Sequence, residues 1–422
     1  MHIAHFVQRY PPALGGSESY FQRLSRYFAA QGHNVTVWTT TAIDLEAFWS
    51  QRAQSLTADT IMDGEVRVRR FAVWRWPLRR YILKALSLFP APTWQALTLP
   101  ANPISPDMWK AAGRDMEPCD MVHAAAFPYA FPIACARRLA QRRGVPFVLT
   151  PFLHLGDPAD ATNRMRRSYL SRPLLHLLKS ADRVMVQTPS ERRAVIESGI
   201  AEDRVVLQGL GVDSADCTGG SRALARQNWG ITESEVVVGH LANLSFEKGT
   251  IDLLRAAQTL WESGQKFRVV LAGPDMGNFR RFWESYGMKD RVVKLGVLDD
   301  QQKREFFAAI DIFALPSRSD SFGLVLLEAW ANRVPNIAYR AGGVADLIQH
   351  DLDGILVTCG EVPELAAGLK RLIANPDRRR ILGNCGHERV AKDFRWRDKL
   401  SIVQTEYDCL KRQLASAVSK SR

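Results

Sequence analysis

The sequence predicts two α/β domains of similar size, each built on a doubly wound parallel sheet, that face each other across a cleft. Short β-rich apolar runs alternate with amphipathic helical patterns from the first residues onward. A second series of the same kind begins at Val236, after a small, polar, glycine-containing stretch at 214–221 that suits a linker. At roughly 150 residues per domain, the length of 422 residues fits about two to three domains.

The first predicted domain covers residues 1–212. It opens with a strand at Ile3–Val7, a glycine-containing loop, a helix closed by Gly32 and a strand at Val35–Trp38, which is how a parallel α/β sheet usually begins. The segment 66–112, which mixes arginine with tryptophan before an apolar, proline-rich run, is expected to be an insertion. The remaining strands are expected at 121–122, 146–150, 183–187 and 205–207.

The second predicted domain covers residues 213–395, and a C-terminal crossover helix and tail follow at 396–422. Ligands of open parallel sheets bind beyond the carboxyl ends of the strands, so two facing sheets would bring two ligands into one cleft. The strands of this domain are expected at 236–242, 268–272, 292–295, 311–315, 335–339 and 355–357.

Composition excludes several classes of protein. The six cysteines form no CxxC pair and are too few for a disulfide scaffold, which favours reduced thiols. The longest uncharged apolar stretch, near 124–136, is shorter than the ~18 apolar residues of a membrane-spanning helix. The first residues lack the basic and then apolar layout of a signal peptide. We therefore expect a cytoplasmic location, with peripheral contact to the inner face of the cytoplasmic membrane as an open alternative.

The net charge of +12 lies mostly in the first half of the chain. Residues 1–200 hold 25 Lys+Arg and 15 Asp+Glu, whereas the remainder holds 31 and 29. A basic surface attracts polyanions, and arginine mixed with tryptophan suits a membrane interface, so an anionic membrane surface is a candidate partner of the segment 66–112. Packing of those aromatic residues on the core is the alternative, and nucleic acid is the less favoured partner.

The strongest chemical signal is the stretch Pro316–Trp330. A strand runs into a polar turn that contains Asp320, and a helix follows. Free amides at the start of this helix suit a diphosphate, and Gly323 would let the ligand approach the backbone. Glu328 lies within the helix between apolar neighbours, where a carboxylate needs a partner such as the paired hydroxyls of a ribose. A simple helix cap is the alternative for Asp320, and a solvated acid is the alternative for Glu328.

Weaker signals lie at the ends of other predicted strands. Lys248 follows the first strand of the second domain and could neutralise phosphate charge. The loop Gly15–Glu18 precedes the first helix and could cradle a phosphate or a sugar. His123 and His154 each follow a strand, where ligand-facing polar groups belong. The alternatives are a solvated side chain for Lys248, a tight turn for the glycine loop and a structural role for each histidine. The sequence contains no HExxH motif and no Cys/His metal spacing.

Together these motifs resemble those of the family 4 retaining glycosyltransferases, whose GT-B fold consists of two facing Rossmann-like domains. The resemblance rests on the order and spacing of motifs over nearly the whole chain. The matching segments are Gly15–Glu18, Asp182–Glu191, Gly211–Asp213, Glu247–Gly249, Gly296–Leu298, Asp320–Glu328, Gly342–Gly343, Asp353–Val357 and Arg395–Trp396.

The resemblance implies a role for each matching residue. Glu328 would hold the ribose of the donor, and Lys248 would hold the diphosphate together with the first helix amides. Asp320 would contact the donor sugar, and His154 would lie at the reacting centre, so these two and Lys248 are the candidate catalytic residues. The implied donor-binding residues are Asn243, Lys248, Val297, Asp320, Phe322, Gly323, Leu324, Val325 and Glu328. The implied acceptor-binding residues are Gly15, Gly16, Glu18 and His123.

The implied reaction moves a sugar from a nucleotide-diphospho-sugar to a hydroxyl of a lipid-linked, polysaccharide or other glycan acceptor, with retention at the anomeric carbon. No metal or other cofactor is expected. Three positions depart from the family pattern: Asp320 replaces a glutamate, Ala242 stands where an arginine is frequent, and the family histidine would fall nearer Phe152 than His154. Two alternatives stay open, a nucleotide-sugar epimerase with the same architecture and a binding protein without catalysis.

Overall fold

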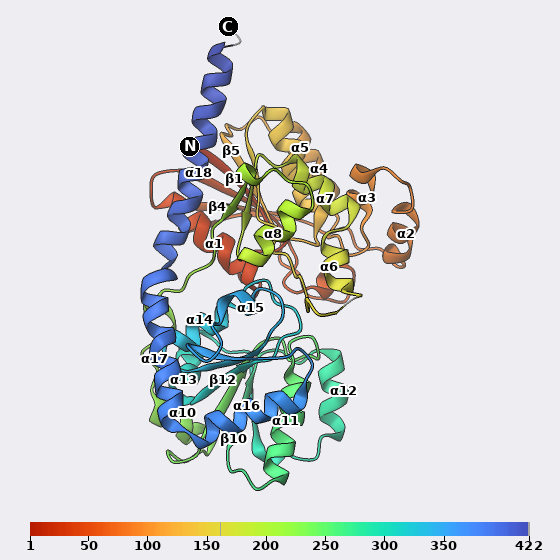
Figure 1. Ribbon diagram of the computed structural model, residues 1–422. Coiled ribbons are helices and arrows are strands. Elements are labelled where there is room, and N and C mark those ends of the chain that lie inside the picture. Colours follow the sequence, from red (N-terminus) through yellow and green to blue (C-terminus); the bar gives the residue numbers. More distant parts are fainter. Residues whose placement is uncertain (161, 421–422) are drawn as a thin grey trace. The chain divides into compact units, whose positions relative to one another are not determined.

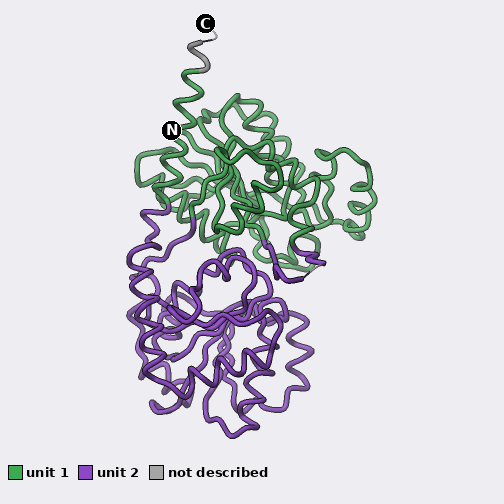
Figure 2. The backbone as a smooth tube through the Cα atoms, viewed as in Figure 1, with its two compact units in different colours: residues 1–153, 166–208, 400–422 green, residues 154–165, 209–399 purple. Residues whose placement is uncertain are grey.

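The computed structural model describes residues 1–160 and 162–420 and divides them into two compact units (Figure 2). Unit 1 consists of Met1–Leu153, Arg166–Gln208 and the chain from Leu400 onward. Unit 2 consists of His154–Met165 and Gly209–Lys399. Each unit contains one sheet, and the two are described separately.

The sheet of unit 1 has eight strands in the order β3-β4-β2-β1-β5-β6-β7-β8 (Figure 1). All neighbours are parallel except β3 and β4. The chain runs outward from β1 in both directions, so the topological switch point lies between β1 and β5. The strands are β1 His2–Phe6, β2 Asn34–Thr40, β3 Thr60–Asp63, β4 Val66–Phe71, β5 Met121–Ala124, β6 Phe147–Leu149, β7 Arg183–Val186 and β8 Val205–Leu207.

The sheet of unit 2 has six strands in the order β11-β10-β9-β12-β13-β14, all parallel. Its switch point lies between β9 and β12, because the chain runs from β9 through β10 to β11 on one side and from β12 to β14 on the other. The strands are β9 Val237–Leu241, β10 Arg268–Ala272, β11 Val292–Gly296, β12 Ile312–Leu315, β13 Asn336–Tyr339 and β14 Gly354–Val357.

Helices connect the strands of both sheets, and local sequence signals mark several helix ends. Asp299 and Gln302 form a capping box, and the Ser221 side chain caps a helix that ends at the left-handed Gly230. In unit 1 the helices are α1 Gly16–Ala29, α2 Arg79–Leu86, α3 Pro92–Thr98, α4 Pro106–Arg114, α5 Ala130–Arg143, α7 Arg172–Ser180 and α8 Pro189–Glu197, and α6 Arg164–Tyr169 begins in unit 2. In unit 2 they are α9 Ser214–Cys217, α10 Arg222–Trp229, α11 Thr250–Glu262, α12 Gly277–Ser285, α13 Asp300–Ala309, α14 Leu324–Ala331, α15 Val344–Leu347, α16 Val362–Ala374 and α17 Pro376–Asp393, and α18 Trp396–Lys420 passes from unit 2 into unit 1.

The prediction of two parallel α/β sheets is confirmed, and two details of it are wrong. The first residues of the segment 66–112 do not belong to an insertion, because they form β4, which lies inside the sheet and pairs with β2. Arginines alternate with apolar residues along β4, and acidic partners such as Asp115 let them lie on the sheet. The predicted linker 214–221 contains α9, and Gly220 packs directly on the backbone of α13.

The cysteines and the helices are both subjects of expectations from composition. All six cysteines are free thiols. Among residues 1–160 and 162–420, no helix combines the length and the apolar composition that crossing a bilayer requires.

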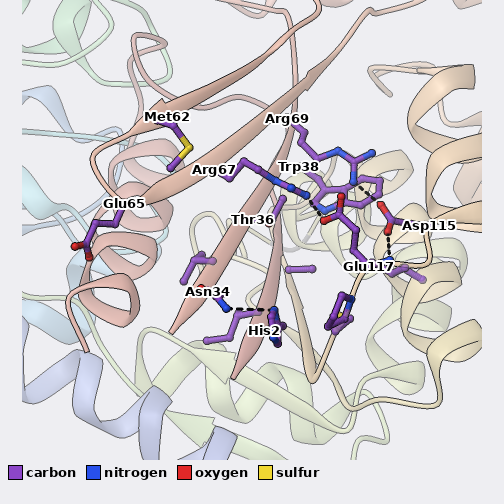
Figure 3. A pocket seen from close by; sticks show the side chains of 16 residues that line it. His2, Asn34, Thr36, Trp38, Met62, Glu65, Arg67, Arg69, Asp115 and Glu117 are labelled. Carbon is purple, nitrogen blue, oxygen red and sulfur yellow. Dashed lines mark hydrogen bonds and ion pairs between the residues drawn. The ribbon is translucent and has the colours of Figure 1, made fainter. Parts of the chain in front are cut away.

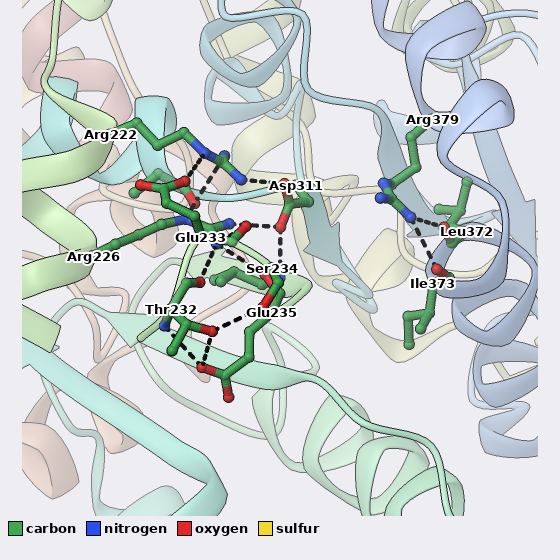
Figure 4. A network of polar contacts seen from close by, with 12 residues as sticks. Arg222, Arg226, Thr232, Glu233, Ser234, Glu235, Asp311, Leu372, Ile373 and Arg379 are labelled. Carbon is green, nitrogen blue, oxygen red and sulfur yellow. Dashed lines mark hydrogen bonds and ion pairs between the residues drawn. The ribbon is translucent and has the colours of Figure 1, made fainter. Parts of the chain in front are cut away.

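A buried polar network fixes α10 in unit 2 (Figure 4). The Arg226 side chain is almost fully buried, and its guanidinium donates to the Ala309 carbonyl, to backbone carbonyls in 232–235 and to Asp311. Arg222 donates to the second oxygen of the same carboxylate, at 2.9 Å. Buried charges are tolerated when they are paired and fully hydrogen-bonded, so this arginine has a structural role.

A second buried network joins α18 to the sheet of unit 1. The Tyr407 hydroxyl lies 3.2 Å from Nε2 of His5 and 2.6 Å from Nδ1 of His123. The other ring nitrogens of these histidines contact Ser25 and Thr150, at 2.8 and 2.7 Å. Both histidines are fully buried, and burial lowers the pKa of each.

This network should make the fold sensitive to acid. Burial lowers the pKa of His5 to about 3, from an ordinary value of 6.5. Between these values the unfolded chain binds a proton that the folded chain does not, so the melting temperature should fall as the pH is lowered from about 6.5 toward 4. His5→Gln should reduce this pH slope, because it removes the buried group that gains a proton only on unfolding. Identical pH slopes in the melting temperatures of His5→Gln and the unchanged protein would contradict the expectation.

Candidate functional site

The candidate site lies at the switch point of the sheet in unit 2. One loop leaves β9 and carries Lys248 to the start of α11. A second loop leaves β12 and carries Asp320 to the start of α14. Because β9 and β12 are parallel neighbours, both loops lie beyond the carboxyl ends of adjacent strands, where ligands of such sheets bind.

Backbone packing holds these two loops together. Gly249 has a left-handed φ of 75°, and a Cβ at this position would overlap the Pro316 carbonyl oxygen. The Arg318 amide donates to the Glu247 carbonyl at 2.9 Å. Below the loops, buried His240 contacts the Ala314 carbonyl and the Thr250 hydroxyl, at 2.8 and 2.9 Å. The loop that carries Lys248 is therefore held in one position against the loop that carries Asp320.

Lys248 and Asp320 form an ion pair as a result. The distance from Lys248 Nζ to Asp320 Oδ2 is 2.6 Å, and both side chains are largely buried. Burial alone would raise the pKa of the Asp320 carboxyl, but the charge of Lys248, with hydrogen bonds from Lys248 and the Phe322 amide, brings it below its ordinary value. The carboxylate is therefore charged at neutral pH.

His154 belongs to the same cluster, because the short segment that carries it is part of unit 2. Burial, followed by the charge of Lys248, lowers the pKa of His154 to about 4, and its ring is hydrogen-bonded to the Ser319 backbone. The imidazole is therefore neutral at physiological pH. Phe152, near which the family histidine would fall, is buried in unit 1 and packs edge-on against Tyr20 at 5.4 Å.

The start of α14 faces the same region. Gly323 precedes the helix with a left-handed φ of 92°, and the next residues, Leu324 and Val325, begin it. The first amides of a helix have no partner within the helix, so they are donors for an anion. Phe322 is buried and packs edge-on against Phe394 at 6.3 Å.

Glu328 lies one turn further along α14. One of its oxygens, Oε1, is paired with Nζ of Lys303, which is on α13. The other oxygen, Oε2, is buried and has no hydrogen-bond partner in the described part of the chain. A buried acceptor without a partner is costly, so Oε2 is suited to a ligand hydroxyl.

Other predicted donor residues lie at the same edge of the sheet without a contact that joins them to this cluster. Asn243 is exposed in the turn after β9, and Val297 is exposed directly after β11. Gly342 is in close contact with the Asp320 backbone, whose carbonyl accepts from the Gly343 amide at 2.8 Å. The predicted glycine turn therefore supports the aspartate loop.

The predicted acceptor residues lie in unit 1. Glu18 is buried and forms an ion pair with Arg9 at 2.7 Å, and its carboxylate fills the space beside Gly15. Gly16, in contrast, has open space where a side chain would be. The assignment of His123 to the acceptor site is wrong, because its ring is fully buried and both nitrogens are bonded to Tyr407 and Thr150.

Sequence reasoning missed three charged residues of the site. Lys303, which neutralises Glu328, lies on a helix with no motif of its own. Arg318 forms an ion pair with buried Asp252 in the first turn of α11, where Tyr339 also donates at 3.1 Å. Arg318 lies within the strongest motif and could have been noted, whereas nothing in the local sequence marks Lys303 or Asp252.

A cavity of about 430 Å³ in unit 1 lies elsewhere (Figure 3). It opens beside His2 and Asn34, the first residues of β1 and β2, which is the opposite edge from the carboxyl ends. Its two arginines, Arg67 and Arg69, are paired with Glu117 and Asp115. Among the described residues, no three His, Cys, Asp or Glu side chains gather as metal ligands would.

Comparisons with known proteins agree with this two-part organisation. A family model described as glycosyl transferases group 1 matches residues 221–389, and one described as a glycosyl transferase 4-like domain matches residues 15–211. N-acetyl-alpha-D-glucosaminyl L-malate synthase from Bacillus anthracis is 33% identical over 183 residues, which are 43% of this chain and 48% of that protein. The chain spans about half the length of the first curated relatives that it matches.

Solved structures extend the likeness to the whole chain. Sucrose-phosphate synthase from Thermosynechococcus elongatus has a TM-score of 0.75 at 22% identity, with 99% of both chains covered. The Anabaena protein HepE, in complex with UDP-glucose, has a TM-score of 0.66 at 19% identity, with both chains fully covered. At these identities the likeness shows a shared fold.

The packing of the two loops gives a test of the site's architecture. Gly249→Ala should destabilise unit 2 by about 2–4 kcal/mol, because the added methyl group overlaps the Pro316 carbonyl and the left-handed conformation disfavours alanine. Gly264→Ala is the matched control, since Gly264 also has a left-handed φ but open space around it, and should cost about 1 kcal/mol. Denaturant unfolding measures both, and equal losses would contradict the close packing.

Proposed function

The chain belongs to the family 4 glycosyltransferases and has their GT-B fold, and on that premise we propose that it moves a sugar from a nucleotide-diphospho-sugar to a hydroxyl of an acceptor. The observation that carries the proposal is the unpartnered Oε2 of Glu328 on the helix whose first amides follow the Asp320 loop. A carboxylate oxygen suits a ribose hydroxyl, and helix amides with Lys248 suit a diphosphate.

The charges of the site fit such a donor. Lys303 neutralises Glu328, so a carboxylate can accept from the ribose without repelling the diphosphate. Asp320 accepts from Lys248 at 2.6 Å and would contact the sugar through its remaining acceptor sites. A neutral His154 beside them can hydrogen-bond a sugar hydroxyl without adding charge.

The difficult step of the proposed reaction is departure of the nucleoside diphosphate. Lys248 and the amides of Leu324 and Val325 stabilise the negative charge that develops on the leaving oxygen. We propose retention: the acceptor hydroxyl attacks on the face from which the diphosphate leaves, and a diphosphate oxygen takes its proton. The nucleoside diphosphate and the glycosylated acceptor then account for all atoms, and neither a protein nucleophile nor a metal is required.

The acceptor proposed for this reaction is a lipid-linked, polysaccharide or other glycan hydroxyl. Support comes from the basic surplus of residues 1–200, which favours an acceptor or a membrane surface that carries negative charge. Gly16, at the start of α1, has open space around it and stays the proposed acceptor contact in unit 1.

Removing the Glu328 charge should weaken donor binding. Glu328→Gln keeps the shape of the side chain but loses the ionised acceptor, so the dissociation constant of the nucleoside diphosphate should rise about ten- to hundred-fold. Glu262→Gln, on the exposed end of α11, is the matched control and should bind normally. A thermal-shift panel with uridine, guanosine and adenosine diphosphates first identifies the base, and calorimetry then measures the affinity. Unchanged affinity in Glu328→Gln would remove the ribose assignment.

Removing the Lys248 charge should act mainly on turnover. Lys248→Met should lower kcat by about a hundred-fold or more, because the leaving diphosphate loses its cation. Lys266→Met, at the amino edge of the sheet, removes the same charge away from the site and should be fully active. Release of nucleoside diphosphate from a nucleotide sugar, with and without acceptor, is the measurement.

Product analysis separates the proposal from its alternatives. A transferase releases nucleoside diphosphate, an epimerase forms an isomeric nucleotide sugar, and a binding protein leaves the donor unchanged. The anomeric configuration of the product, read from proton coupling constants, tests retention. An inverted product would refute the same-face attack.

A further inference from the structure

Arg79 is a buried cation without a partner. It is the first residue of α2, its side chain is 2% exposed, and its three guanidinium nitrogens have no hydrogen-bond partner among the described residues. Arg226, which is buried to the same degree, donates to several carbonyls and to a carboxylate. A buried guanidinium that the protein leaves unpaired is therefore suited to an oxyanion from outside the chain.

Arg79 lines a cavity of about 350 Å³, which we call the Arg79 cavity. Two further cations, Arg52 and Arg80, line it, together with three aromatic residues, Trp49, Trp76 and Tyr81, and no acidic residue is among the residues that line it in the described chain. The Arg80 guanidinium lies over the Trp49 ring, 5.0 Å from its centroid, which fixes one wall.

The segment that carries Arg79 has a surplus of positive charge. The sequence has seven Lys+Arg and no Asp or Glu between Glu65 and Asp107. The first three of these cations, on β4, are paired with acids from other segments, whereas Arg79, Arg80 and Lys84 form no ion pair within the described residues. Burial, followed by the charge of Arg80, lowers the pKa of Arg79 to about 10, so the guanidinium keeps its proton at neutral pH.

Large apolar side chains are exposed at the cavity and along α2. Five of them are more than half exposed and define what we call the α2 rim: Trp76, Leu78, Tyr81, Leu88 and Phe89. They lie on and beside α2, at the periphery of unit 1 (Figure 1). Exposed patches of this kind mark interaction sites, and aromatic residues next to Arg and Lys are typical of the membrane–water interface.

We propose that the Arg79 cavity binds the phosphate group of an anionic phospholipid while the α2 rim enters the membrane interface. A phosphate supplies the two adjacent oxygens that match a guanidinium, and Arg52 and Arg80 neutralise the remaining charge. The apolar rim selects a lipid over a free phosphate, because only a lipid brings an apolar surface together with its anion. This site is separate from the donor site of unit 2 and does not depend on the proposed reaction.

The test is sedimentation of the full chain with vesicles of phosphatidylcholine, alone or with phosphatidylglycerol. The full chain should sediment with the anionic vesicles. Arg79→Met should weaken this binding by about ten-fold or more, because the guanidinium–phosphate hydrogen bonds are lost. Arg193→Met, which removes an exposed cation from α8, is the matched control and should change binding by less than about two-fold.

A melting curve distinguishes ligand binding from a structural role of Arg79. Without vesicles, Arg79→Met should melt at or above the temperature of the unchanged protein, since an unpaired buried charge is replaced by an apolar side chain of similar length. A lower melting temperature together with lost binding would mean that Arg79 supports the fold, and would overturn the proposal. The double variant Leu88→Ser, Phe89→Ser should lose vesicle binding at an unchanged melting temperature, because both residues are exposed.

The source of the phosphate is tested separately. Inorganic phosphate or glycerol phosphate is added to the unchanged protein and to Arg79→Met, and the melting temperatures are compared. The lipid proposal would be overturned if either phosphate raised the melting temperature of the unchanged protein only, and if the unchanged protein did not bind vesicles. The cavity would then be assigned to a free phosphate. Equal vesicle binding by Arg79→Met and the unchanged protein would overturn it as well. The Glu328→Gln variant should bind vesicles normally, which keeps this outcome distinct from failure of the donor site.

Discussion

Two loops that leave neighbouring strands of the second sheet meet through backbone atoms at Gly249 and Pro316, with no side chain between them. Backbone contact of this kind leaves little freedom for sliding, so the loops keep one register and Lys248 stays 2.6 Å from Asp320. His240 supports the same contact from below by joining β9 to β12 and α11. The polar groups of the candidate donor site are therefore positioned before any ligand arrives, which lowers the cost of ordering them on binding.

Buried polar side chains of this chain differ in whether the protein itself satisfies all of their hydrogen bonds. Arg226, His5 and His123 are buried polar residues whose partners lie in the protein, and they join segments far apart in the sequence. Arg79 is buried as well, and Glu328 is partly buried, but each has buried polar atoms without a partner in the described chain. Since such atoms are costly to leave unpaired, they are the better indicators of where a ligand belongs.

The two candidate sites differ in how their charge is balanced. In the donor site of unit 2, Asp320 is paired with Lys248 and Glu328 with Lys303, so the site is close to neutral and offers directed hydrogen bonds. Around Arg79 the charge is uncompensated and the neighbours are aromatic. A neutral, directional site suits recognition of a small polar donor, whereas a cationic site with an apolar rim suits a surface that is itself charged and partly apolar.

The sequence by itself determined the two α/β sheets and the glycine loops and polar turns at their carboxyl ends, because strand and helix periodicity and turn chemistry are local properties of the chain. Only the tertiary structure decided that β4 joins the sheet and that His123 is bonded to Tyr407. It also supplied Lys303 for Glu328 and left Arg79 unpaired. Each of these outcomes depends on which distant side chains the packing of elements brings together, and local sequence patterns do not encode such contacts.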